Sequence, residues 1–140
     1  MSASVFPYLL VSDAPAALEL YAKVFGMKEL YRIPWNDKVG HAELEHAGSR
    51  IFLASAFPEM NLNGPAAGQT AVSLVLIFDD VDAVFARASE AGFEVERAPK
   101  DEPHGSRVAV VRCPFGHRWM LEQILEKLSD EEIQKRYGAG

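Results

Sequence analysis

A histidine and a carboxylate lie at strand spacing in this chain and could form one polar cluster. His41 and Glu43 are two residues apart in the alternating apolar and polar run Val39–His46. Residues two apart in a strand share a face, so both side chains should point the same way. Such a pair could attract a cationic or hydrogen-bond-donating ligand, or contribute to a divalent metal site. A less specific interpretation is that Glu43 and Glu45 are solvated and that His41 pairs with one of them.

A second carboxylate lies near the other end of the chain. Glu122 follows Met120 by two residues in the run Trp119–Leu125, so these two side chains should also share a face. If the two strands lie opposite each other, His41, Glu43 and Glu122 could meet.

The remaining reactive residue types carry weaker signals. His117 has the ordinary pKa range of a general base, although hydrogen bonding within its turn or packing beside Trp119 is the commoner role. His104 lies in a charged loop, where we expect solvent exposure, although loops at a cavity mouth often carry binding groups. Cys113 is the single cysteine, which excludes an internal disulfide, and we expect it to be buried and inert.

The elements that must position these residues occur twice. An apolar run ending at Val11 is followed by Asp13, a helical pattern and Gly26; a second run ending at Phe78 is followed by Asp79, a helical pattern and Gly92. Both the aspartates and the glycines are 66 residues apart (79 − 13 and 92 − 26). About three strand-like runs follow each helix. The repeat predicts an α+β fold of two βαβββ modules, with curved mixed sheets around a cavity and helices on the outer faces.

The expected elements form one domain over residues 1–140, with modules at about 4–56 and 70–125 and a linker at 57–69. The expected strands are Val5–Val11, Glu29–Ile33, Val39–His46, Ile51–Ser55, Ala71–Phe78, Phe93–Arg97, Arg107–Arg112 and Trp119–Leu125. The expected helices are Ala14–Phe25, Val81–Ala91 and a short C-terminal helix at 129–137, which opens with a capping box at Ser129 and Glu132. The first strand is apolar on both faces, which predicts burial on both sides, and the fifth strand is expected to be largely buried.

Composition excludes several classes of partner. The net charge is −6 and no basic cluster is present, so nucleic acid is not an expected partner. No apolar run approaches the roughly 20 residues that a membrane span needs. The N-terminus lacks the basic start and apolar stretch of a signal peptide. These features predict a cytoplasmic protein with no membrane partner.

Several motifs, taken together and in order, resemble the vicinal oxygen chelate superfamily of glyoxalase I, bleomycin-resistance proteins and extradiol dioxygenases. They are Leu9–Asp13, Leu20-Tyr21 with Phe25-Gly26, His41–Leu44, Phe78–Ala83 and Pro114–Trp119. The last motif resembles the small bacterial PhnB-like subgroup, whose members usually carry Asp where this chain has Cys113. The resemblance extends to about Leu125 and implies a homodimer. The superfamily includes isomerases, lyases, oxygenases and drug-binding proteins, so its fold does not fix an activity.

The resemblance also implies where a metal would be bound. Metal-dependent members place ligands at positions that correspond here to Phe6, Glu43, Ser73 and Met120. Only Glu43 is a good ligand for a divalent ion, and a catalytic metal needs about three protein ligands. We therefore expect no cofactor. A divalent metal held by His41, Glu43 and Glu122 is the alternative.

These considerations predict a ligand cavity between the first, third, fifth and eighth strands. Alternation directs seven side chains into it: Tyr8, His41, Glu43, Ser73, Val75, Met120 and Glu122. The expected function is metal-independent binding of a small molecule. One alternative is a metal-dependent lyase, isomerase or dioxygenase with displaced ligands. Another is a non-catalytic structural or partner-binding homodimer.

Overall fold

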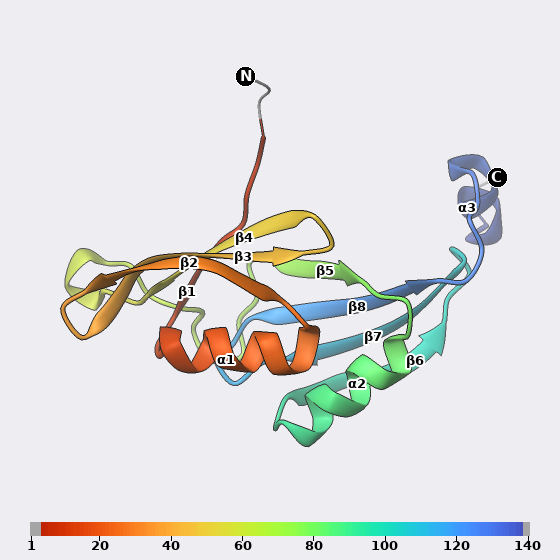
Figure 1. The fold of residues 1–140 in the computed structure, drawn as a ribbon. Helices are drawn as coiled ribbons and strands as arrows, with labels where there is room; N and C mark the ends of the chain where they lie inside the picture. Colours follow the sequence, from red (N-terminus) through yellow and green to blue (C-terminus); the bar gives the residue numbers. More distant parts are fainter. Residues whose placement is uncertain (1–3, 139–140) are drawn as a thin grey trace. The chain divides into compact units, whose positions relative to one another are not determined.

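A computed structural model describes residues 4–138 and contains two compact units, which divide between Gln69 and Thr70. Each unit is a βαβββ module with one four-stranded mixed sheet (Figure 1). The α+β class and the two modules predicted from the repeat are confirmed.

In the first unit, the strand order is β1-β4-β3-β2, with β1 parallel to β4 and the other pairs antiparallel. The elements are β1 (Tyr8–Val11), α1 (Ala14–Phe25), β2 (Lys28–Trp35), β3 (Lys38–His46), β4 (Ser49–Ser55) and a 3-10 turn, η1 (Pro58–Met60).

The second unit repeats this arrangement with the order β5-β8-β7-β6, in which β5 is parallel to β8. Its elements are β5 (Ser73–Ile77), α2 (Val81–Glu90), β6 (Glu94–Asp101), β7 (Ser106–Arg112), β8 (Arg118–Ile124) and α3 (Asp130–Arg136). Helix α3 follows β8 and lies well apart from α2 (Figure 1).

Polar caps start the three helices where the sequence predicts them. Asp13 accepts a hydrogen bond from the Ala16 amide, Asp80 from the Ala83 amide, and Ser129 from the Glu132 amide. Each cap satisfies an amide that would otherwise lack a partner at the helix start. The helices therefore begin at fixed positions relative to the preceding strands.

One face of each sheet is covered by its helix and forms the core. Ala42 and Leu44 of β3 are fully buried beneath α1, and Trp119 and Leu121 of β8 are fully buried on the side that α2 covers. Burial of each large apolar side chain contributes about 1.5–3 kcal/mol. The alternate residues of β3 and β8 therefore lie on the opposite, helix-free faces, where the candidate polar groups are found.

Two of the four edge strands, β2 and β6, are longer than the sequence predicts. Strand β2 continues through Pro34, and β6 continues through Pro99 into residues expected to form a loop. Both prolines occur at register shifts, between Ile33 and Pro34 and between Arg97 and Lys100. Proline cannot donate to a ladder, but an edge strand with a bulge tolerates it.

The first and fifth strands are shorter than predicted, and they are less buried than predicted. The prediction that the first strand is buried on both sides is wrong, as is the prediction that the fifth is largely buried. The β1 ladder starts only after Pro7, which has no amide to donate. On the helix-free faces, Tyr8 is 49 % exposed and Val75 is 53 % exposed. The helix of each unit covers one face of its sheet only. Within the described residues, no helix combines the length and apolar character that crossing a membrane requires.

Candidate functional site

Strand alternation brings three of the predicted site residues together in the first unit. Tyr8 and His41 are joined by a hydrogen bond of 2.6 Å between the phenol oxygen and Nδ1. His41 Nε2 lies 2.9 Å from Glu43 Oε2. These two hydrogen bonds therefore connect Tyr8 of β1 to His41 and Glu43 of β3 on the helix-free face.

Glu43 is the centre of this first-unit cluster. It is only 7 % exposed, so the expectation of a solvated Glu43 is wrong, whereas its pairing with His41 is as expected. Its carboxylate also accepts hydrogen bonds from the Tyr31 hydroxyl and, at 2.6 Å, from Arg50 Nη1. The bonds from His41, Tyr31 and Arg50 lower the pKa of Glu43 from 4.5 to about 2, because each stabilises the ionised form.

This ionised carboxylate fixes the roles of the neighbouring groups. Because it can only accept, neutral His41 donates from Nε2 to Glu43 and accepts at Nδ1 from the Tyr8 hydroxyl. Burial, followed by the negative charge of Glu43, raises the pKa of Tyr8. The hydrogen bond to Glu43 is the main cause of the raised pKa of Tyr31. Both phenols are therefore held as neutral hydrogen-bond donors.

Aromatic rings surround the imidazole. The His41 ring centroid lies 5.2 Å from Phe52, 5.3 Å from Tyr8 and 5.8 Å from Tyr31. Phe6 stacks on Phe52 with centroids 4.8 Å apart. The hydrogen-bonded group of Tyr8, His41 and Glu43 is therefore surrounded by an aromatic surface.

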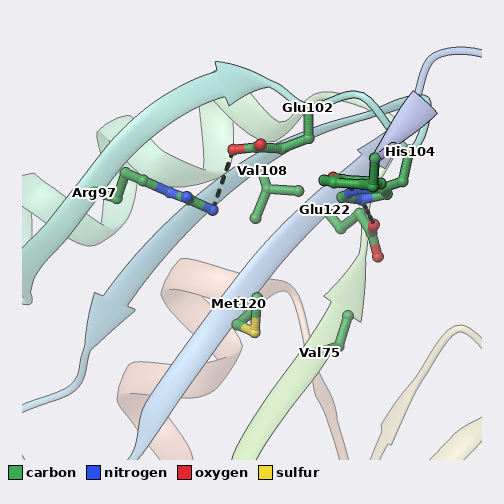
Figure 2. Close-up of a pocket in the computed structure, with 8 residues that line it drawn as sticks. Val75, Arg97, Glu102, His104, Val108, Met120 and Glu122 are labelled. Atoms are coloured by element: carbon green, nitrogen blue, oxygen red, sulfur yellow. Dashed lines mark hydrogen bonds and ion pairs between the residues drawn. The ribbon is translucent and has the colours of Figure 1, made fainter. Parts of the chain in front are cut away.

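The second unit contains a pocket of about 360 Å³, within the usual size range of small-molecule sites. Its lining residues come from all four strands of the sheet, the loop between β6 and β7, and the residue after α3. They are Val75, Arg97, Glu102, His104, Val108, Met120, Glu122 and Tyr137. Seven of them are labelled in Figure 2.

Strand register places the apolar and acidic lining residues on one face. Val75 pairs with Met120 across β5 and β8, and Val108 pairs with Glu122 across β7 and β8. Laterally paired residues share a face of the sheet. The valine and methionine side chains therefore form an apolar floor next to the Glu122 carboxylate.

One hydrogen-bonded pair and one ion pair supply the polar groups of the pocket. His104 Nε2 lies 2.9 Å from Glu122 Oε1. Arg97 Nη2 lies 3.3 Å from Glu102 Oε1, close enough for an ion pair but without the alignment of a hydrogen bond. In Figure 2 the two pairs lie on either side of Val108. Two carboxylates face one guanidinium, so the pocket favours ligands that are cationic or donate hydrogen bonds.

Tyr137 completes the pocket from the C-terminal side. Its hydroxyl lies 3.1 Å from His104 Nδ1, and the two rings are inclined by 19°. His104 is thus bracketed by a carboxylate at Nε2 and a phenol at Nδ1, the same partners that His41 has in the first unit.

Six of the seven predicted residues fall into two groups, one in each unit. Tyr8, His41 and Glu43 meet in the first-unit cluster, while Val75, Met120 and Glu122 line the second-unit pocket. Ser73 is not among the residues that line this pocket; its hydroxyl accepts a 2.8 Å hydrogen bond from Arg118. A single cavity that includes all seven residues stays a prediction.

Several members of these sites were not expected from the sequence. His104 is half-buried and bonded on both nitrogens rather than solvated. Its position in a loop was the one feature of the sequence that could have indicated a binding role, because loops at a cavity mouth often carry binding groups. Tyr137, Arg97 and Glu102 are brought to the pocket by the path of β6 and of the C-terminal segment, and no sequence spacing marks them. Cys113 is 4 % exposed, which agrees with its expected burial.

The four positions that the resemblance associates with a metal do not fit a divalent ion. Phe6 has no donor atom, and Met120 offers only a soft thioether sulfur. The Ser73 hydroxyl accepts from Arg118, and both Glu43 oxygens accept from other side chains. Across residues 4–138, no three His, Cys, Asp or Glu side chains are grouped in a way that could hold a metal ion. Glu122, from the alternative ligand set, is paired with His104.

The fold and the motifs agree with a sequence comparison. Residues 4–121 match the Glyoxalase/Bleomycin resistance protein/Dioxygenase superfamily, and the chain belongs to this superfamily. Two mycobacterial proteins, uncharacterized protein Mb0911c of Mycobacterium bovis (strain ATCC BAA-935 / AF2122/97) and uncharacterized protein Rv0887c of Mycobacterium tuberculosis (strain ATCC 25618 / H37Rv), are each 39 % identical to it over 133 residues. These alignments cover 91 % of this chain and 88 % and 78 % of the two relatives, respectively.

Solved structures share the same fold. TioX from Micromonospora sp. ML1 is 25 % identical, with a TM-score of 0.68 and coverage of 91 % of this chain and 100 % of that one. The fosfomycin resistance protein FosX from Listeria monocytogenes, solved with Mn(II) and sulfate, is 17 % identical, with a TM-score of 0.68 and 98 % coverage of both chains. At this identity, the likeness to FosX concerns the fold alone.

Proposed function

We propose that this chain is a metal-independent small-molecule-binding protein and that the second-unit pocket holds the ligand. The observation that carries the proposal is a pocket of about 360 Å³ with an apolar floor, the His104–Glu122 hydrogen bond and the Arg97–Glu102 ion pair. Apolar surface gives affinity, and a few fixed polar groups give orientation, as is typical of ligand sites. The ligand is a compact molecule with an apolar body and a cationic or hydrogen-bond-donating group directed at Glu122.

Metal independence rests on donor chemistry. In the first unit, Arg50 occupies one oxygen of Glu43, and Tyr31 and His41 occupy the other. A metal there would have to displace donors that already hold the carboxylate ionised. We expect metal analysis of protein purified without chelators to give well under one metal per chain. A stoichiometric divalent metal that is lost in Glu43→Gln would instead support the metal-dependent lyase, isomerase or dioxygenase.

A fragment screen followed by methyl NMR tests ligand binding directly. Binders should shift the methyl signals of Val75, Val108 and Met120, which form the pocket floor. Glu122→Gln should weaken cationic binders about tenfold, because a charge-assisted hydrogen bond is worth roughly 1.5–3 kcal/mol and the variant keeps a neutral acceptor. Glu90→Gln, on the exposed end of α2, removes the same charge away from the pocket and should leave affinity unchanged. Binders that shift no floor methyl, or equal affinity in both variants, would contradict the proposal.

Homodimer formation is part of the same proposal. The helix-free face of the first sheet exposes large apolar groups, including Tyr31, Ile33 and Trp35. Exposed patches of this kind on a folded protein usually contact a partner. We expect sedimentation at micromolar concentration to give a dimer that Ile33→Lys weakens; a wild-type monomer would contradict this.

We also propose that the chain belongs to the PhnB-like subgroup and acts in the cytoplasm. The subgroup assignment is supported by the tight turn at Pro114–Trp119. There the Cys113 amide donates to the His117 carbonyl at 3.0 Å, and the Gly116 amide donates to the Cys113 carbonyl at 2.9 Å.

A further inference from the structure

We propose that the second-unit pocket binds planar ligands carrying a neutral, hydrogen-bond-donating hydroxyl of the phenol type, and that Tyr137 is an internal occupant which such a ligand replaces. This inference rests on the proposed function, because it names the chemistry of the ligand for the same pocket. Four features of the second unit support it.

The first feature is a histidine with one fixed acceptor atom. Glu122 accepts from His104 Nε2 at 2.9 Å, so the neutral imidazole presents Nδ1 as an acceptor. The Tyr137 hydroxyl donates to this atom at 3.1 Å. A carboxylate behind an imidazole fixes both its tautomer and its orientation. Nδ1 of His104 can therefore accept a hydrogen bond from the hydroxyl of a ligand.

The second feature is the weak attachment of the group that now uses this acceptor. Helix α3 has no buried residue, and Tyr137, which follows it, is 54 % exposed. Besides the bond to His104, the helix is held by Arg136, which pairs with Glu126 and donates to the Pro103 carbonyl. Exposed ion pairs of this kind contribute little to stability. A ligand can therefore displace Tyr137 without disrupting the core.

The third feature is the shape and charge of the space beside His104. Val75, Val108 and Met120 offer apolar surface against which a flat ring can pack. Glu102 and Glu122 disfavour an anion, and the guanidinium of Arg97 is already paired with Glu102. A neutral phenol fits this environment better than a carboxylate or a phosphate ester.

The fourth feature is that the chain uses the same combination elsewhere. In the first unit, Tyr8 donates to Nδ1 of His41, whose Nε2 is held by Glu43. The two arrangements arise differently, since His41 and Glu43 share β3, whereas His104 comes from a loop and Glu122 from β8. In both, a carboxylate-oriented imidazole takes a phenol hydroxyl.

The test compares two probes that differ only at the hydroxyl. 4-Methylphenol reproduces the tyrosine side chain, and 4-methylanisole replaces its hydroxyl proton with a methyl group. Affinities are measured by NMR titration of the Val75, Val108 and Met120 methyls in wild type, Tyr137→Ala and Tyr137→Phe. Gln134→Ala, at an exposed position of the same helix, is the matched control. Thermal unfolding checks that every variant is folded. If Tyr137→Ala does not fold, Tyr137→Phe provides the test.

We expect both Tyr137 variants to bind 4-methylphenol roughly fivefold more tightly than wild type, since a competing intramolecular hydrogen bond has been removed. The control should match wild type, 4-methylanisole should gain less than 4-methylphenol in Tyr137→Phe, and adding His104→Leu should abolish the gain. Equal affinity for the two probes, or no gain in either variant, would overturn the inference. If other fragments still shift the methyl signals of the pocket floor, the proposed function stands without the inference about phenols. If no molecule shifts these signals, the inference and the proposed function both fail.

Discussion

Replacement of Gly105 by alanine should loosen the loop that carries His104. Gly105 has φ +95°, and a Cβ there would lie 2.6 Å from the Glu126 carbonyl oxygen. The Gly105 carbonyl also accepts from the amides of Leu125 and Glu126, at 2.9 and 3.0 Å. This glycine therefore joins the His104 loop to the segment that leads into α3.

Gly92 provides a matched control for the magnitude. Its φ is +91°, nearly that of Gly105, but a Cβ added at Gly92 would have no atom within 4 Å. Gly92→Ala should therefore cost only the backbone strain, about 1–2 kcal/mol. Gly105→Ala carries the same strain, and the Glu126 carbonyl must also move by about 0.8 Å to restore a 3.4 Å contact. Weakening the two hydrogen bonds at about 1 kcal/mol each brings the total to about 3–4 kcal/mol.

Urea unfolding of both variants checks this difference. At typical denaturant sensitivities of about 1–3 kcal/mol per molar, an extra 2 kcal/mol lowers the midpoint of Gly105→Ala by about 1 M relative to Gly92→Ala. The unfolded-state effect of replacing glycine by alanine is the same in both and cancels. Gly105→Ala should also weaken binding of pocket ligands, whereas Gly92→Ala should not. Equal midpoints would refute the role assigned to the contact with Glu126.

Three further predictions concern stability and reactivity. Because folding lowers the pKa of Glu43 from 4.5 to about 2, its stabilising contribution is complete above pH 4.5 and is lost as pH falls through 2. The urea midpoint should therefore decrease more between pH 5 and pH 2 in wild type than in Glu43→Gln. Equal decreases in the two proteins would contradict this. Trp119→Ala, at a fully buried position, should cost about 3–5 kcal/mol by urea unfolding; less than 1 kcal/mol would contradict the packing under α2. Cys113 should react with a thiol reagent far more slowly in native protein than in urea, because it is 4 % exposed, and equal rates would show that it is accessible.

The amino-acid sequence by itself determined the local elements and their duplication. Helix starts depend on residues such as Asp13, Asp80 and Ser129, whose side chains cap the nearest amides, and these effects act within one turn. Strand alternation is equally local, so the facing of His41 and Glu43 away from α1 follows from periodicity alone. Strand ends were less predictable, because the tolerance for Pro34 and Pro99 depends on β2 and β6 being edge strands.

Only the tertiary structure decided which polar groups meet. Arg50 and Tyr31 reach Glu43 from neighbouring strands, and Tyr137 reaches His104 from 33 residues away. Hydrogen bonds over such separations depend on the path of the chain between the partners, and sequence spacing does not encode that path. The same long-range contacts lower the pKa of Glu43 and complete the pocket around His104, so the chemistry of both sites is a property of the folded units rather than of any motif.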